Sequence, residues 1–315
     1  LTTINDLIDS IPDFNPEEQA GIRKAFGVYS SAVAVFTGRN AASTGSFSFD
    51  NDGGDFSVLN IPISHTYGEK GDTARFKVRA ALGYFRSTYS DSTFSDLVAE
   101  EIPELAGSGA NQPDFGKDQA LSGTLGGGVV FSPVEGLNIE PFMDFIWTHA
   151  KRRYDYNNLG SAIIALKYDR DIFNYSTESI TYAPGIDVNY KIDLCDGYSL
   201  TPSALYNHLW TEDLWSKSQF GEFSIDSGIF KTGLALSIPV SRETFKREVA
   251  LQPFTNFVLL NGAAKDAIGD KELYEFGADI AVGVESDWIK AVKVGAAYIT
   301  SSNLDGYRIN LGASF

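Results

Sequence analysis

Three basic side chains on one face of a single predicted strand are the most chemically distinctive feature of the sequence. Arg75, Lys77 and Arg79 alternate with apolar residues, so they point to the same side of that strand. Later strands add charges of both signs on the same side. Charges around a water-filled constriction can set ion selectivity, and they can equally anchor a segment that lies inside the pore. The predicted inward-facing set is Arg75, Lys77, Arg79, Glu140, Asp144, Asp187, Lys191, Lys231, Glu275, Asp279, Lys293 and Arg308.

The residues offer little for catalysis. The sequence has three histidines, His65, His149 and His208, and a hydrolase would need a histidine beside a serine or an acid. His149 and His208 fall on the outward side of their predicted strands near Trp147 and Trp210, where rings with a polar tip suit a membrane interface. No phosphate loop, zinc-ligand spacing or nucleophile elbow occurs. We therefore expect no catalytic residues and no enzyme activity.

One acidic segment resembles part of a calcium loop. Asp50, Asp52 and Asp55 supply oxygen ligands around two glycines. The bidentate glutamate that should follow at a fixed spacing is absent, so a tight turn with solvated acids is the alternative interpretation. Calcium on the extracellular loops is the one cofactor that the sequence suggests.

The charged residues are predicted to lie on the strands of a closed β-barrel. Runs with alternating apolar residues recur along the chain, and the connections between them are alternately short and long, which is typical of barrels in bacterial outer membranes. Counting from about Ala42 gives twelve antiparallel strands. The last strand, 307–315, carries an outward apolar row and is predicted to end beside the first strand near 45–50. That outward row includes Tyr307, Ile309, Leu311 and Phe315.

Composition and charge limit the alternatives. The 315 residues contain no apolar run of roughly 18 residues, which excludes a transmembrane helix. The net charge of −16 argues against a nucleic-acid partner. The single cysteine, Cys195, allows no intrachain disulfide. Because the first residue is leucine and no basic segment with an apolar core follows it, we expect a mature chain whose secretion signal has been removed.

The first 41 residues differ from the rest and are predicted to be a separate helical segment. A helix start at Asn15 and Pro16 is followed by apolar residues at helical spacing up to Gly38. Some 22 helical residues span about 33 Å, roughly the depth of a membrane barrel. We therefore expect this helix to lie in the lumen of a barrel formed by 42–315, and a periplasmic helix outside the pore is the alternative. The predicted plug residues are Glu17, Glu18, Arg23, Lys24, Phe26 and Tyr29.

A lumen-length helix followed by a twelve-stranded barrel that ends in Tyr-x-Ile-x-Leu-x-Ala-x-Phe resembles the translocator domain of autotransporters. With only about forty residues before the barrel, the chain most resembles solitary autotransporter-like barrels without a passenger. The resemblance implies the outer membrane of a Gram-negative bacterium, assembly by the barrel assembly machinery reading 307–315, and a helix-plugged pore. Outer-membrane lipid, lipopolysaccharide, the assembly machinery, and small solutes or ions are the expected partners.

Two functions remain compatible with these features. The protein is either a channel for ions or small solutes that the helix plugs or narrows, or a surface scaffold whose extracellular loops bind a partner while the helix is a permanent plug. The inward charges favour the channel, because they serve transport more directly than adhesion.

Overall fold

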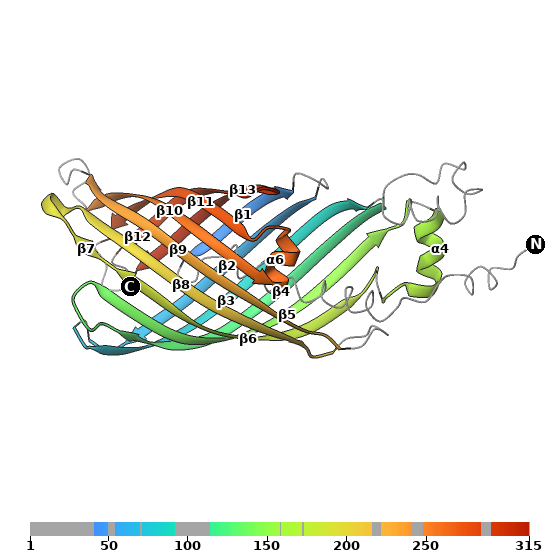
Figure 1. Cartoon of the computed structure of the whole chain (residues 1–315), viewed down its shortest axis with the longest axis horizontal. Helices are drawn as coiled ribbons and strands as arrows, with labels where there is room; N and C mark the ends of the chain where they lie inside the picture. Colours follow the sequence, from blue (N-terminus) through green and yellow to red (C-terminus); the bar gives the residue numbers. More distant parts are fainter. Residues whose placement is uncertain are drawn as a thin grey trace, which may run out of the picture.

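Twelve long antiparallel strands form a closed barrel in the computed structural model (Figure 1). The structure describes residues 41–49, 54–69, 71–91, 114–157, 159–171, 173–215, 222–240, 248–284 and 291–314. The strands of the wall are β1 (Ala42–Phe49), β2 (Asp55–Tyr67), β3 (Ala74–Asp91), β4 (Asp114–Phe131), β5 (Leu137–Asp155), β6 (Ser176–Tyr190), β8 (Ser199–Asp213), β9 (Ser224–Val240), β10 (Val249–Gly262), β11 (Glu272–Gly283), β12 (Ala291–Thr300) and β13 (Leu304–Ser314).

Each strand pairs with its neighbours in the chain, and two further pairings close the sheet. The first and last strands, β1 and β13, are hydrogen-bonded to each other, and β6 pairs directly with β8. Between β6 and β8 lie only the two-residue β7 (Ile192–Asp193) and the 3₁₀ turn η1 (Cys195–Gly197). The prediction of a twelve-stranded antiparallel barrel is therefore confirmed. The predicted lumen helix lies outside the residues that the structure describes.

The register of the closing pair corrects one detail of the sequence analysis. Ala42 lies opposite Leu311 and Phe49 lies opposite Leu304. Because the two strands are antiparallel, the end of β13 lies beside the beginning of β1, and not beside 45–50 as predicted. The predicted partner strand was right, but the predicted position along it was wrong.

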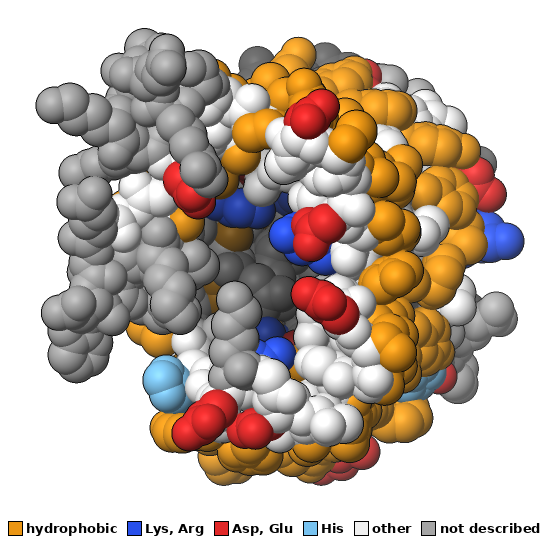
Figure 2. Space-filling view, turned by 90° about the vertical axis from the view of Figure 1, so that its left-hand side faces the viewer, with side chains coloured by type: hydrophobic (Ala, Val, Ile, Leu, Met, Phe, Trp, Pro, Cys, Tyr) orange, Lys and Arg blue, Asp and Glu red, His pale blue; other side chains and the backbone are white. Residues whose placement is uncertain are grey.

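The two faces of the wall differ in chemistry. Large apolar side chains such as Ile63, Leu82 and Leu125 are 69%, 63% and 64% exposed on the outer face. Figure 2, which looks at one end of the barrel, shows apolar side chains over the outer wall and charged ones around a central hollow. A soluble β-sandwich would bury its apolar face, so an outer wall of this kind is suited to lipid.

The two ends of the barrel also differ. One end, the turn end, carries the short connections β2–β3, β4–β5 and β6–β8. The opposite end, the loop end, carries two short helices: α4 (Leu159–Tyr168) in the β5–β6 connection and α6 (Ala263–Ile268) in the β10–β11 connection (Figure 1). In the part of the chain that the structure describes, no helix has the length and apolarity needed to cross a membrane.

Candidate functional site in the barrel lumen

Two ion pairs span the lumen wall from β3 to β5, across the intervening strand β4. Lys77 Nζ lies 2.9 Å from Glu140 Oε2, and the Arg79 guanidinium pairs with the Asp144 carboxylate. Gly126 of β4 lies opposite both Arg79 and Asp144. A Cβ atom at Gly126 would collide with the Asp144 carboxylate. The glycine therefore leaves the gap through which side chains from non-adjacent strands meet.

A second charged cluster surrounds Glu275 on β11, which is only 2% exposed. Its carboxylate accepts hydrogen bonds from Lys231 Nζ and Asn256 Nδ2, both at 2.9 Å, and pairs with the Arg308 guanidinium. Arg308 Nε also donates to Asn310 Oδ1 at 2.9 Å. Burying a carboxylate is costly unless its oxygens are paired, and here two cations and an amide share this one group. We call the two clusters together the ionic belt.

The other predicted lumen residues lie around the ionic belt. Asp279 is half-buried on the inward side of β11, and its Oδ1 atom is buried without a hydrogen-bond partner among the described residues. Asp187 on β6 adds a weaker attraction to Lys231. Arg75 is half-buried near the turn end of β3.

Lys191 was predicted to face inward on a strand, but the structure places it beyond the end of β6. There it is exposed and pairs with Asp193, with 2.7 Å between Nζ and Oδ1. Although β6 has ended at Tyr190, Lys191 still lines a cavity at the turn end of the lumen.

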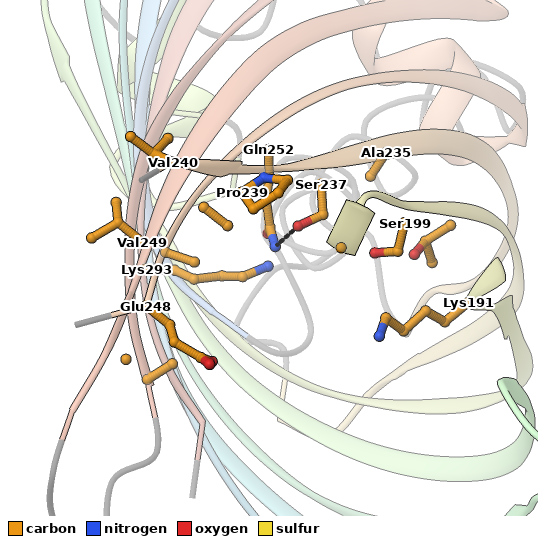
Figure 3. Close-up of a pocket in the computed structure, with 16 residues that line it drawn as sticks. Lys191, Ser199, Ala235, Ser237, Pro239, Val240, Glu248, Val249, Gln252 and Lys293 are labelled. Atoms are coloured by element: carbon orange, nitrogen blue, oxygen red, sulfur yellow. Dashed lines mark hydrogen bonds between the residues drawn. The ribbon is translucent and has the colours of Figure 1, made fainter. Parts of the chain in front are cut away.

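A cavity of about 570 Å³ opens at the turn end and is lined by residues of β8 to β12 together with Lys191 and Gly197 of the β6–β8 connection. Figure 3 shows Lys293 and Gln252 pointing into it, with Gln252 hydrogen-bonded to Ser237. A second cavity of about 300 Å³ shares Gln252 and Lys293 with the first and is also lined by Arg308. The ionic belt therefore borders space that is connected to the turn end.

An apolar belt encircles the lumen nearer the loop end. Its aromatic members include Phe47 and Phe56, whose ring centroids are 4.9 Å apart, and Phe85, which is 5.7 Å from Phe56. All of its members are buried. The apolar belt comprises Phe47, Phe56, Val58, Phe85, Ala120, Ala150, Ala183, Leu209, Ile229, Val258, Leu260, Ala264, Ile268, Leu273, Ile299 and Leu304.

The apolar belt was not predicted, because the apolar residues of the strands were assigned to the lipid side. Asn256 and Asn310 of the ionic belt were not predicted either. The inward parity of Phe85, six residues beyond Arg79 on β3, was the signal that could have revealed the apolar belt. Along β11 the order from the loop end is Leu273, Glu275 and Asp279. The lumen is thus apolar toward the loop end and polar toward the turn end.

The histidines lie on the outer wall. The ring centroids of His149 and Trp147 are 6.4 Å apart, and those of His208 and Trp210 are 4.3 Å apart. His149 Nδ1 also lies 3.6 Å from Glu178 Oε1. The His65 ring is likewise 4.5 Å from that of Tyr67. The outward direction predicted for His149 and His208 is confirmed, and their position at the membrane interface stays a prediction.

The predicted calcium ligands are not brought together in the described part of the chain. Asp55 is exposed at the start of β2, while Asp50 and Asp52 lie outside the described residues. Among the described residues, no three or more His, Cys, Asp or Glu side chains are arranged to hold a metal ion.

The predicted assembly residues lie on the outer wall as far as they are described. Tyr307, Ile309 and Leu311 are 70%, 57% and 55% exposed on β13, and Phe315 lies outside the described residues. Their role in assembly stays a prediction. The predicted plug residues Glu17, Glu18, Arg23, Lys24, Phe26 and Tyr29 also lie outside the described part of the chain.

A hydrogen-bonded clasp joins two connections at the loop end. The Asp270 carboxylate accepts hydrogen bonds from the hydroxyl groups of Ser301 and Ser302 and from the backbone N–H of Asn303, the last at 2.9 Å. Burial alone would raise the pKa of Asp270, but these hydrogen bonds to the charged form outweigh it and lower that pKa. The clasp therefore holds a carboxylate in its ionised form.

Comparison with known proteins places the barrel among autotransporter domains. Residues 40–312 match the family model described as "Solitary outer membrane autotransporter beta-barrel domain". No curated protein matches the chain.

Three similar solved structures are autotransporter domains. The β-domain of the Bordetella autotransporter BrkA has 13% identity and a TM-score of 0.55, with 87% of this chain and 98% of that chain covered. The transport unit of AIDA-I from Escherichia coli has 13% identity and a TM-score of 0.53, with 96% of this chain and 100% of that chain covered. The translocator domain of NalP from Neisseria meningitidis has 12% identity and a TM-score of 0.52, with 91% of this chain and 93% of that chain covered. At these identities the likeness concerns the fold.

Proposed function

We propose that this chain, which belongs to the family of solitary outer-membrane autotransporter β-barrel domains, is a channel for ions or small solutes that is narrowed inside its lumen. The barrel lies in the outer membrane of a Gram-negative bacterium. Long connections of such barrels face the outside, so the loop end is extracellular and the turn end is periplasmic. The observation that carries the proposal is the ionic belt bordering the turn-end cavities.

The charges of the ionic belt are suited to a narrow passage. Glu275 attracts both Lys231 and Arg308, and Lys293 points into the adjoining cavity (Figure 3). Rings of charged side chains set ion selectivity where a pore is narrow. A solute entering from the periplasmic side would meet Lys293 first and the Glu275 cluster next.

The apolar belt supports the further proposal that residues 1–41 form a helix within a barrel made by 42–315. All members of the apolar belt are buried, which is expected of a lumen that is filled and not open to water at this depth. Because β1 begins at the turn end, Tyr29 in such a helix would lie nearer the turn end and the ionic belt, and Glu17 nearer the loop end. The helix would then narrow or plug the channel.

A second candidate is a surface scaffold whose extracellular loops bind a partner, with the helix as a permanent plug. Hydrogen bonds in the β5–β6 connection support it: Asp169 accepts from Tyr156 Oη at 2.8 Å and from Asn174 Nδ2 at 3.0 Å. Burial, followed by the hydrogen bond to Asp169, raises the pKa of Tyr156. A hydrogen-bonded connection of this kind is suited to presenting a fixed surface to a partner.

Conductance in planar lipid bilayers tests the channel and separates it from the scaffold. We expect the full chain to give small current steps, and a variant lacking residues 1–40 to give larger ones. A folded barrel that conducts in neither form is not a channel, and the scaffold would then be the better proposal.

A further inference from the structure

We propose that the outer wall of β3 to β6 binds lipopolysaccharide, with its phosphates on a basic patch and one acyl chain in an apolar groove next to the patch. The basic patch consists of Arg86, Lys117, Lys151 and Arg153. The proposal rests on the outer-membrane location and does not depend on whether the barrel conducts.

The strand register brings the four cations together. Arg86 lies in one row with Lys151, separated only by Gln119, and Lys117 lies directly beside Arg153 in the next row. Directly opposed residues on one face have Cβ atoms about 5 Å apart. All four follow the outward parity of β3, β4 and β5, at the loop end of strands that run side by side in Figure 1.

The cations of the basic patch are accessible to an anionic ligand. Arg86, Lys151 and Arg153 are exposed and Lys117 is half-buried. Within the described part of the chain, none of the four forms an ion pair with a carboxylate. The acids on the same outward face, Asp55, Asp155 and Glu178, lie at the margins of the patch. Four clustered cations on a chain of net charge −16 indicate an anionic ligand.

The apolar groove begins two rows nearer the turn end. It has a volume of about 450 Å³, and small outward residues, Ala80 and Gly123, leave the space between larger apolar side chains. No atom lies within 4 Å of where a Cβ of Gly123 would stand. The larger lining residues are Ile61, Ile63, Leu82, Leu125, Phe145, Trp147 and Ile180.

The spacing of patch and groove fits one amphipathic molecule. Lys151 lies four residues beyond Trp147 on β5, which is about 13 Å along a strand. In the row between them, Tyr84 Oη accepts a hydrogen bond from Gln119 of the patch row at 2.8 Å. The cations therefore lie at headgroup depth when the groove lies in the hydrocarbon core.

Lipopolysaccharide fits this arrangement better than a phospholipid. It carries more than one phosphate on one molecule, so it can contact both rows of the basic patch, whereas a diacyl phospholipid such as phosphatidylglycerol carries a single phosphate. Its acyl chains extend into the leaflet that the loop end adjoins. Multiple charge-assisted contacts to phosphate favour Arg and Lys at such positions.

The test measures binding of purified lipopolysaccharide to the full chain in detergent by native mass spectrometry. One variant combines Arg86→Gln, Lys117→Gln, Lys151→Gln and Arg153→Gln. A second, Gly123→Leu, fills the groove without meeting a neighbouring atom at its Cβ. Matched controls are Lys271→Gln, an exposed loop-end cation outside the patch, and Ala296→Leu, an exposed outward residue on β12. Heat-modifiable mobility on gels verifies that every variant is folded.

We expect the quadruple variant to bind at least about tenfold more weakly, Gly123→Leu to bind measurably more weakly, and both controls to match the unmodified protein. Dephosphorylated lipopolysaccharide and phosphatidylglycerol should each bind the unmodified protein at least about tenfold more weakly than lipopolysaccharide. Undiminished binding by either test variant overturns the site, and so does equally tight binding of phosphatidylglycerol.

Discussion

Arg79 and Asp144 form an ion pair across a strand to which neither belongs. Gly126 of that intervening strand lies opposite both residues, and a side chain there would occupy the position of the Asp144 carboxylate. The pair is nearly inaccessible to solvent, with side-chain exposures of 5% and 7%. The glycine is therefore as necessary to the ionic belt as the charges are.

Replacing Gly126 with valine should separate Arg79 from Asp144 and leave two buried charges poorly paired. Breaking a buried ion pair costs about 3–5 kcal/mol, so we expect the free energy of unfolding in urea to fall by that order. The control is Gly123→Ala, whose Cβ meets no atom within 4 Å. Equal stability of the two variants would show that the ion pair does not require the absence of a side chain at Gly126.

Neutralising Glu275 by Glu275→Gln should destabilise the barrel more than neutralising an exposed acid. The change leaves Lys231 and Arg308 near each other without the shared carboxylate. We expect a loss of about 3–5 kcal/mol in urea unfolding. Glu272→Gln, three residues away and exposed, serves as the control and should change little. A Glu275→Gln barrel as stable as the control would contradict the role of the cluster.

The loop-end clasp should open in acid. Because the folded-state pKa of Asp270 is lowered, its contribution to stability is fully present above the ordinary aspartate pKa of 3.8 and is lost as the pH falls through the lower folded-state value. Hydrogen exchange of the Asn303 amide across this range measures the effect. Loss of protection already above pH 3.8 would mean that Asp270 is not stabilised as its partners suggest.

A charge on the lipid-facing side of the last strand should lower the fraction of barrels that fold in the membrane. Ile309 is 57% exposed on the outer wall of β13, and an arginine near the bilayer midplane of a barrel costs about 2–4 kcal/mol. Ile309→Arg should reduce the heat-modifiable, folded fraction in membranes. Leu166→Arg on α4, an equally exposed position at the loop end, should not. Equal folded fractions of the Ile309→Arg and Leu166→Arg variants would argue against contact of Ile309 with lipid.

The strands and the direction of their side chains were predictable because alternation is a local property of the sequence. Lys77 and Arg79 could be assigned to one face in this way. The partners Glu140 and Asp144 could not be assigned to them, because the pairing depends on the register of β4, which only the closed sheet determines.

The apolar belt was not predictable by the same rule. Alternation separates two faces but does not identify which apolar residues face lipid and which face the lumen. Phe85 follows the parity of Arg79, yet it belongs to an apolar layer and not to the charged one. The depth at which the lumen changes from polar to apolar is set by contacts among many strands, so the sequence of a single strand does not predict it.

The reversal potential under a salt gradient tests most directly whether ions pass along the ionic belt. Lys293 lines both turn-end cavities and is exposed, so Lys293→Glu should leave the fold intact and reverse one charge on the proposed path. We expect the reversal potential to shift toward cation preference, and Lys271→Glu, outside the lumen path, to cause no shift. Channels of Lys293→Glu with the same reversal potential as the unmodified protein would contradict conduction along the ionic belt.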